Sequence, residues 1–254
     1  MSDKIERAAK LLAEAWRGPS TLEAVPADLR PANMEEAVAT QDAMAAAIGE
    51  EVVGWKVAGQ PGAPVGRVFA STSYENGATL PHDRFKRCFL ESELALRLDR
   101  DLPPRDAAYT DAEVADACTL VLTVELVGSR LTEGKVIPDT EDEKRFIVAD
   151  NAAQLGLVVG PDVPGWRDME ALDLPISATV GGDPLPEQPR ENRRDPVVVT
   201  HWLANELSRR GIGLTRGQIV TTGSATIPSP LPPGQEAVVD YGALGTITLR
   251  VATS

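Results

Sequence analysis

Two glutamates placed two residues apart in an apolar strand constrain this chain more than any other feature. Glu91 and Glu93 lie in residues 89–98, where leucines alternate with other residues in the period-2 pattern of a β-strand. Side chains two positions apart project from the same face of a strand and are separated by about 6.5–7 Å along it. Two carboxylates held in this way repel each other unless a cation lies between them.

A third acidic residue, Glu125, lies in a still more apolar run, residues 119–127. Burial of a lone carboxylate is costly unless it is paired, protonated or bound to a metal. Oxygen donors on two strands suit a hard cation such as Mg²⁺ or Mn²⁺. The two histidines are isolated and the two cysteines, Cys88 and Cys118, are far apart, which argues against a zinc site and a disulfide framework.

Composition sets broader limits. The 254 residues are 43% hydrophobic, so a globular chain is expected, in one domain or one domain with a small appendage. The net charge of −13 argues against non-specific binding to nucleic acid or to anionic membranes. No run approaches the roughly 20 apolar residues of a membrane span. The N-terminus lacks the form of a signal peptide, and with so few cysteines we expect a cytoplasmic protein.

The pattern along the chain predicts an α+β fold. Residues 1–50 are expected to form an N-terminal helical segment, and residues 51–254 a mixed-β domain with peripheral helices. The charged run 141–145 is interpreted as a solvated loop or an oligomer contact. Strands and helices do not alternate regularly, which disfavours a Rossmann fold or a βα-barrel. Helices are predicted at 5–16, 33–49, 110–117 and 200–210, and strands at 52–58, 89–98, 119–127, 156–160, 176–181, 218–222, 236–240 and 245–252.

Six short motifs follow one another in a fixed order. They are Gly54-Trp55-Lys56-Val57, Glu91-Ser92-Glu93, Glu125, Ala149-Asp150-Asn151-Ala152, Gly223-Ser224-Ala225-Thr226 and Asp240-Tyr241-Gly242-Ala243-Leu244-Gly245. No single motif is specific. The ordered set resembles the 2-keto-4-pentenoate hydratase and 4-oxalocrotonate decarboxylase branch of the fumarylacetoacetate hydrolase superfamily, and the similarity runs from the second predicted helix to the C-terminus.

The resemblance implies a mixed β-roll, barrel-like core and a lyase that acts on a 2-oxo or 2-hydroxydienoic acid through a metal-stabilised enolate. Mg²⁺ or Mn²⁺ would be the cofactor, and a small 2-oxo acid would be the substrate. The expected assembly is a homo-oligomer, with possible association with a related pathway enzyme. The implied site residues are Glu91, Glu93 and Glu125 as metal ligands, Lys56 beside the bound substrate, and Asp150, Asn151, Ser224 and Thr226 as substrate contacts.

Three positions depart from the pattern of this family. Ser71 stands where its hydratases usually carry an aspartate that handles protons at the distal end of the substrate, and Ser71 is the catalytic candidate beside Lys56. Ala153 stands where many of them have a serine. The segment Gly59–Gly66 is shorter than the loop that usually closes over the substrate. The departures affect the distal half of the site and leave the metal half intact.

Other interpretations stay open for the residues and for the reaction. Glu91 and Glu93 could face solvent on an edge strand, Glu125 could pair with an arginine, and Lys56 could be exposed. Asp150 could cap a helix that follows it, and the Gly223–Thr226 motif could be a turn. The alternative functions are a decarboxylase, an acylpyruvate-type hydrolase or isomerase on the same scaffold, and a non-catalytic 2-oxo-acid-binding partner subunit.

Overall fold

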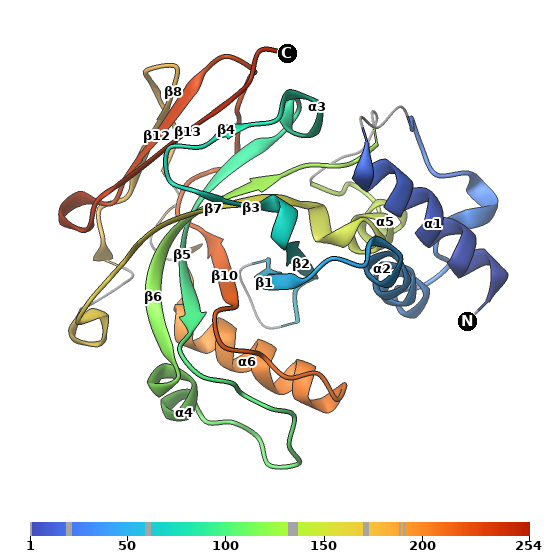
Figure 1. Cartoon of the computed structure of the whole chain (residues 1–254), viewed down its shortest axis with the longest axis horizontal. Coiled ribbons are helices and arrows are strands. Elements are labelled where there is room, and N and C mark those ends of the chain that lie inside the picture. Colours follow the sequence, from blue (N-terminus) through green and yellow to red (C-terminus); the bar gives the residue numbers. More distant parts are fainter. Residues whose placement is uncertain are drawn as a thin grey trace.

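A large curled sheet dominates the structure. The computed structural model describes residues 2–18, 22–58, 62–131, 137–169, 173–187, 189 and 192–254. Figure 1 shows the large sheet bent into a half-barrel, with a smaller sheet on one side of it and a group of helices at the opposite end. The α+β class and the barrel-like core expected from the sequence are confirmed. Within the described residues, no helix is both long and apolar enough to cross a membrane.

The strands form two sheets. The large sheet runs in the order β2-β1-β10-β5-β6-β7-β3 with β11 paired to β5, and the small sheet runs β4-β13-β12-β8-β9. Strands β2, β3, β4, β9 and β11 were not predicted; all but β2 have two or three residues, too few to show alternation, and β2 begins inside the Gly59–Gly66 segment that was interpreted as a loop. The strands are β1 (Val52–Val57), β2 (Val65–Phe69), β3 (Ser73–Glu75), β4 (Thr79–Leu80), β5 (Phe89–Leu98), β6 (Cys118–Val127), β7 (Gln154–Asp162), β8 (Ser177–Val180), β9 (Asp183–Pro184), β10 (Ile219–Ser224), β11 (Ser229–Pro230), β12 (Glu236–Asp240) and β13 (Thr246–Val251).

The described α-helices begin at residues whose side chains cap the first turn, except the short helix His82–Phe85, which follows Pro81. Asn33 accepts a hydrogen bond from the backbone N–H of Glu36, and Gly49 ends the same helix at a φ of 70°. The helices are α1 (Asp3–Arg17), α2 (Met34–Ile48), α3 (His82–Phe85), α4 (Asp111–Asp116), α5 (Glu141–Ala149) and α6 (Pro196–Arg209). Pro196 at the first helical position explains why α6 begins before the predicted residue 200.

Strands β5 and β6 carry the three acidic residues Glu91, Glu93 and Glu125. They pair antiparallel without interruption from Phe89 opposite Val127 to Leu98 opposite Cys118. This register places Glu91 directly opposite Glu125. Because directly opposed residues project from the same face of a sheet, two of the three acidic side chains are brought together by strand pairing alone.

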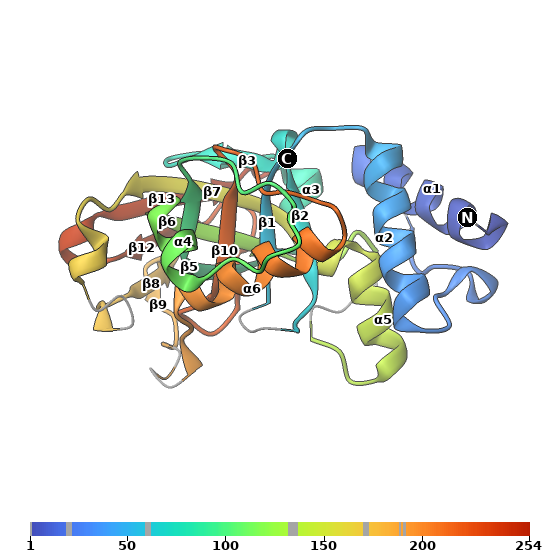
Figure 2. The ribbon, with the colours of Figure 1, turned by 90° about the horizontal axis from the view of Figure 1, so that it is seen from below.

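Three helices form a lobe at the end of the large sheet. Figure 2 shows α1, α2 and α5 side by side, apart from the strands. They share a hydrophobic core of their own, to which β2 contributes Phe69. The interpretation of residues 141–145 as a loop was wrong, because these residues form the first half of α5. A capping box between Thr140 and Glu143 begins the helix. Val148 lies in the hydrophobic core of the lobe, and Phe146 packs against that core.

A left-handed turn follows α5. Asn151, Ala152 and Ala153 have φ values of 57°, 53° and 61°. Left-handed conformations cost a non-glycine residue roughly 1–2 kcal/mol each, so the surrounding contacts must hold this turn in place. The idea that Asp150 caps a helix after it was wrong: Asp150 lies at the C-terminal end of α5, and its side chain caps no helix.

Candidate active site

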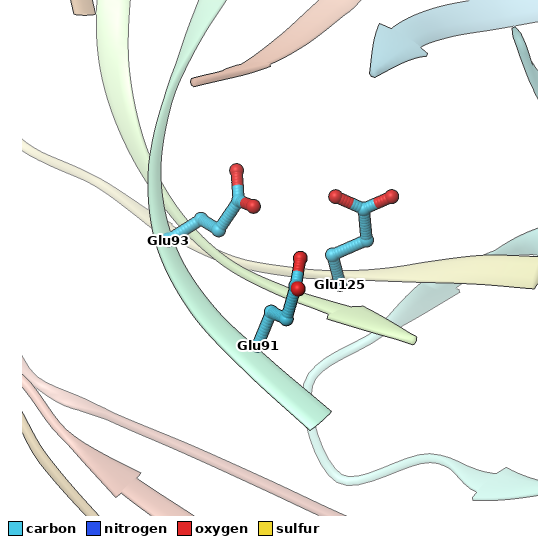
Figure 3. A group of neighbouring side chains, drawn as sticks. All are labelled: Glu91, Glu93 and Glu125. Carbon is cyan, nitrogen blue, oxygen red and sulfur yellow. The ribbon is translucent and has the colours of Figure 1, made fainter. Parts of the chain in front are cut away.

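Three glutamates converge on one point of the large sheet. Glu91 and Glu93 extend from β5 and Glu125 from β6, and Figure 3 shows their carboxylates pointing toward one another. One carboxylate oxygen of each lies within 4.8 Å of the others. Glu93 and Glu125 are 1% and 0% exposed, and the Glu91 side chain is 15% exposed. The solvent-facing edge-strand interpretation is therefore excluded, since β5 lies between β10 and β6.

Strand β10 fixes the orientation of Glu93. Its Oε2 accepts hydrogen bonds from the backbone N–H groups of Thr222 and Gly223 at 2.9 and 3.0 Å. Gly223 has a φ of 109°, a conformation open to glycine, and the register between β10 and β5 shifts at this point. The irregularity thus turns two successive backbone N–H groups, which in a regular strand would point to opposite sides, toward one buried carboxylate.

Lys56 lies among the acidic side chains. Its Nζ is 3.1 Å from Glu125 Oε1 and 3.9 Å from Glu91 Oε2. The lysine is only 6% exposed, so the interpretation of Lys56 as an exposed residue was wrong. The ion-pair partner of Glu125 among the described residues is this lysine and not an arginine. Parallel pairing of β1 with β10 sets Lys56 beside Thr221, whose hydroxyl donates to Glu125 Oε2 at 3.2 Å.

The charges of the cluster do not balance. Burial raises the pKa of Glu93 well above its usual range, and the neighbouring Glu125 and Glu91 raise it further. Burial also raises the pKa of Glu125, to about 7, although Lys56 opposes the shift. Burial lowers the pKa of Lys56, but Glu125, Glu91 and Glu93 outweigh that effect and the net pKa is raised. The lysine is therefore a resident cation that neutralises one of three carboxylates.

The donor set fits a divalent cation. All three donors are carboxylates, the ligands preferred by Mg²⁺ and Mn²⁺. Glu125 Oε1 is buried and has no hydrogen-bond partner within the described part of the chain, although Lys56 lies nearby. A charge of +2 added to three carboxylates and one ammonium makes the cluster neutral. Burial is the main cause of the raised pKa values of Glu93 and Glu125, and repulsion by the neighbouring carboxylates, which such a cation would offset, adds to it.

Asp150 and Asn151 are held by neighbouring residues. Asp150 Oδ1 accepts from Arg130 Nη1 at 2.8 Å, and its Oδ2 accepts from the Ser129 hydroxyl at 3.0 Å. The Asn151 side chain pairs with both backbone groups of Arg67, its Oδ1 accepting from the N–H and its Nδ2 donating to the carbonyl, each at 2.8 Å. These contacts lock the left-handed turn against β2, while substrate contact by either residue stays a prediction.

The remaining predicted residues lie on the periphery of the cluster or away from it. Thr226 is buried and its Oγ1 donates to Ser92 Oγ at 3.1 Å, while the Ser224 hydroxyl donates to the Thr226 carbonyl at 2.7 Å. The Ser71 side chain is exposed, and its backbone N–H donates to Glu50 Oε2 at 3.2 Å. Within the described residues, the structure records no contact between Ser71 and Glu91, Glu93 or Glu125. Residues 59–61 of the short loop lie outside the described residues.

Sequence reasoning missed three groups that position the cluster. These are the Thr221 hydroxyl, the two N–H groups of Thr222 and Gly223, and the Tyr241 hydroxyl, which donates to the Thr123 carbonyl at 2.6 Å behind Glu93. The first two stand immediately before Ser224 in the chain. The two consecutive threonines before a glycine at the end of an apolar strand were the available signal.

The chain is similar to several known hydratases. It is 31% identical over 185 residues, 70% of its length, to a 2-oxo-hept-4-ene-1,7-dioate hydratase of Escherichia coli, of which the alignment covers 66%. It is 30% identical over 203 residues to a 2-keto-4-pentenoate hydratase of Paraburkholderia phymatum, covering 78% of this chain and 71% of that protein. No family model matches the chain.

The fold also has a counterpart among solved structures. A 4-oxalocrotonate decarboxylase from Pseudomonas putida G7, complexed with magnesium and adipate, superposes with a TM-score of 0.81. The superposition covers 98% of this chain and 97% of that one, at 20% identity. At this identity the likeness establishes a shared fold.

Proposed function

The chain belongs to the 2-keto-4-pentenoate hydratase and 4-oxalocrotonate decarboxylase branch of the fumarylacetoacetate hydrolase superfamily, and we propose that it is a divalent-metal-dependent hydro-lyase for a small 2-hydroxydienoic acid or its 2-oxo tautomer. The convergence of Glu91, Glu93 and Glu125 around Lys56 carries this proposal. Mg²⁺ or Mn²⁺ is the proposed cofactor, and a related fold has been solved with magnesium.

The carboxylates would hold the cation, and the cation when bound would supply Lewis acidity to the 2-oxo-acid group of the substrate. Glu93 is pre-oriented by the Thr222 and Gly223 N–H groups, and Glu125 by the Thr221 hydroxyl. A ligand set that is fixed before binding loses little conformational entropy when it binds. The β10 contacts are therefore proposed to position the ligands.

Lys56 would act mainly through its charge. Its raised pKa keeps the ammonium protonated at neutral pH, so it can stabilise negative charge that builds on the substrate oxygens as the dienol tautomerises. A general base would need the opposite shift, toward the working pH. We therefore assign Lys56 an electrostatic role, in preference to proton abstraction.

The distal end of the substrate decides between hydration and decarboxylation. Hydration adds water across the remaining C=C bond and needs a group there that handles protons, whereas decarboxylation needs none at that position. Ser71 makes its recorded hydrogen bond with Glu50 and none with Glu91, Glu93 or Glu125 in the described part of the chain, and Ala153 has no polar side chain. The decarboxylase is therefore the second candidate. Assembly into a homo-oligomer and association with a related pathway enzyme are proposed with either activity.

Turnover of a 2-hydroxydienoate tests the proposal. We expect Mg²⁺- or Mn²⁺-dependent loss of the dienol absorbance, abolished in Glu91→Gln and in Glu125→Gln. Glu236→Gln is the matched control, because this exposed glutamate pairs with Arg250 on the small sheet. Identification of a hydroxylated 2-oxo acid as product supports the hydratase, and release of CO₂ supports the decarboxylase. Full turnover in both active-site variants would refute the metal-site assignment.

A further inference from the structure

A basic cavity lies between the helical lobe and the large sheet. The cavity is open to solvent, and the empty space in and around it, open solvent included, is about 460 Å³. Helix α1 contributes Trp16, and the segment containing α3 contributes Arg84, Lys86 and Arg87. Arg130, after β6, lines the same cavity. None of these residues belongs to the glutamate cluster or has been assigned a part in the proposed reaction.

The indole of Trp16 holds two guanidinium groups. The Cζ atoms of Arg84 and Arg130 lie 4.4 and 4.1 Å from the centre of its ring. Stacking of this kind fixes a guanidinium plane while leaving its N–H groups available at the edges. The arrangement places two cations against one aromatic side chain, where they repel each other.

The protein itself compensates these charges only in part. Arg130 pairs with Asp150 behind the cavity, with Nη1 to Oδ1 at 2.8 Å. Arg84 donates to the Trp16 carbonyl at 2.8 Å, and no ion pair of Arg84 occurs within the described residues. Among the residues that line the cavity, Asp83 is the carboxylate, and its side chain is 61% exposed and 3.8 Å from Lys86. Arg84, Lys86 and Arg130 thus bring more positive charge to the cavity than Asp83 offsets, in a chain whose net charge is −13.

Buried donors at this cavity are also unpaired. Trp16 Nε1 and Arg130 Nε have no hydrogen-bond partner within the described part of the chain. Both side chains are almost fully buried, at 2% and 5% exposure. A buried donor without an acceptor costs about 1–3 kcal/mol, so this corner of the fold contains more donors than the protein satisfies.

We propose that the cavity binds a small oxyanion, a phosphate or carboxylate group, between Arg84 and Arg130 with Lys86 at its mouth. Guanidinium groups match both anions because two parallel N–H groups meet two oxygens. Arg130 also donates through Nη2 to the Gln154 carbonyl at 2.8 Å, and Asp150 joins it to the left-handed turn. An anion would therefore bind where the helical lobe meets the turn that pairs with β2.

Titration of the metal-free full-length protein with inorganic phosphate tests the proposal, with malonate as a second arm. We expect saturable binding by calorimetry with a Kd of about 1 mM or tighter, and a change in tryptophan fluorescence that is lost in Trp16→Phe. Whichever anion binds more tightly identifies the chemical source. Absence of saturable binding of both up to about 10 mM would overturn the proposal.

Matched variants locate the binding. Arg84→Met, which keeps the apolar stem, should weaken binding by about tenfold or more, and Lys86→Met by a smaller factor. Arg250→Met is the control, because this arginine is exposed on β13 and pairs with Glu236. Should Arg84→Met fail to fold by circular dichroism, Lys86→Met decides, because its side chain is only half-buried. Unchanged affinity in the folded variants would refute the assignment.

Discussion

Replacement of Lys56 by methionine isolates the role of the resident cation. The substitution keeps most of the apolar stem and removes the ammonium that lies 3.1 Å from Glu125 and 3.9 Å from Glu91. In the metal-free protein it leaves the carboxylates of the cluster without their cation. We therefore expect a less stable metal-free protein and, unlike a simple packing defect, a loss that a divalent cation reverses.

The distances set the magnitude. At an effective dielectric constant of about 20, the Glu125 contact is worth about 5 kcal/mol and the Glu91 contact about 4 kcal/mol. Protonation of Glu125, whose pKa is already about 7, offsets part of the loss at neutral pH. A net destabilisation of about 3 kcal/mol is expected, in line with the removal of one partner of a buried pair. For a chain of this size it lowers Tm by about 6–12 °C.

The metal response should have the opposite sign. A lysine ammonium repels a divalent cation, so Lys56→Met should bind Mn²⁺ more tightly than the wild type while losing turnover. Thermal unfolding in chelator and in Mn²⁺ measures both effects, because a ligand that binds the folded state raises Tm, and at a fixed ligand concentration the rise grows with the logarithm of its affinity. Lys144→Met is the control, since this lysine is half-exposed at the surface of α5.

Two results would refute this reasoning. A Lys56→Met protein with the Tm of the wild type in chelator would show that the ammonium does not compensate the carboxylates. A variant whose Mn²⁺ affinity falls together with its stability would show that Lys56 organises the ligands instead of opposing the cation. The Lys144→Met control should leave Tm in chelator, Mn²⁺ affinity and turnover unchanged.

Three further outcomes are expected. Glu93→Gln should raise the stability of the metal-free protein and abolish metal binding, both measured by thermal unfolding, because its carboxylate is buried with a raised pKa. Burial raises the pKa of Glu125 to about 7 from 4.5, so its contribution to metal-free stability is present below pH 4.5 and is lost as the pH rises through about 7. Calorimetry should accordingly show Mn²⁺ affinity rising from about pH 5.5 to about pH 8, as fewer protons must be displaced. Gly66→Ala should destabilise the fold in urea unfolding by about 1–3 kcal/mol, since the new Cβ would lie 2.4 Å from the Asn151 carbonyl oxygen.

The metal half of the site could be predicted because it depends on local rules. Alternation in residues 89–98 fixes which side chains share a face, and a lone acid in residues 119–127 demands a partner. The strand assignments then needed only correct pairing for Glu91 to oppose Glu125. Periodicity does not show which strands pair. The resemblance carried by the order of the motifs is what predicted that Glu125 joins Glu91 and Glu93.

Other parts of the fold were beyond local rules. Helix α5 was missed because its charged first turn resembles a solvated loop, while its packing partners, α1 and α2, are distant in sequence. The left-handed turn after it is stabilised by the Asn151 side chain on β2, a contact across 84 positions. The N–H pair at Thr222 and Gly223 arises from a register shift between strands, which side-chain patterns do not encode.

The electrostatics of the cluster connect the fold to its proposed chemistry. Three carboxylates, two of them buried, outnumber the one lysine; burial, with repulsion between the carboxylates, raises the pKa of Glu93 and of Glu125 and so favours proton uptake by the metal-free protein. A divalent cation makes the same set neutral without protons. The negative charge of a 2-oxo acid that binds there then meets a neutral cluster and is not repelled by uncompensated carboxylates. The fold thus supplies a strong preference for a cation and, through it, for an anionic substrate. Differences between hydration and decarboxylation must therefore arise from groups beyond the cluster, so exchanging Ser71 for aspartate should alter the product ratio while leaving Mn²⁺ affinity unchanged.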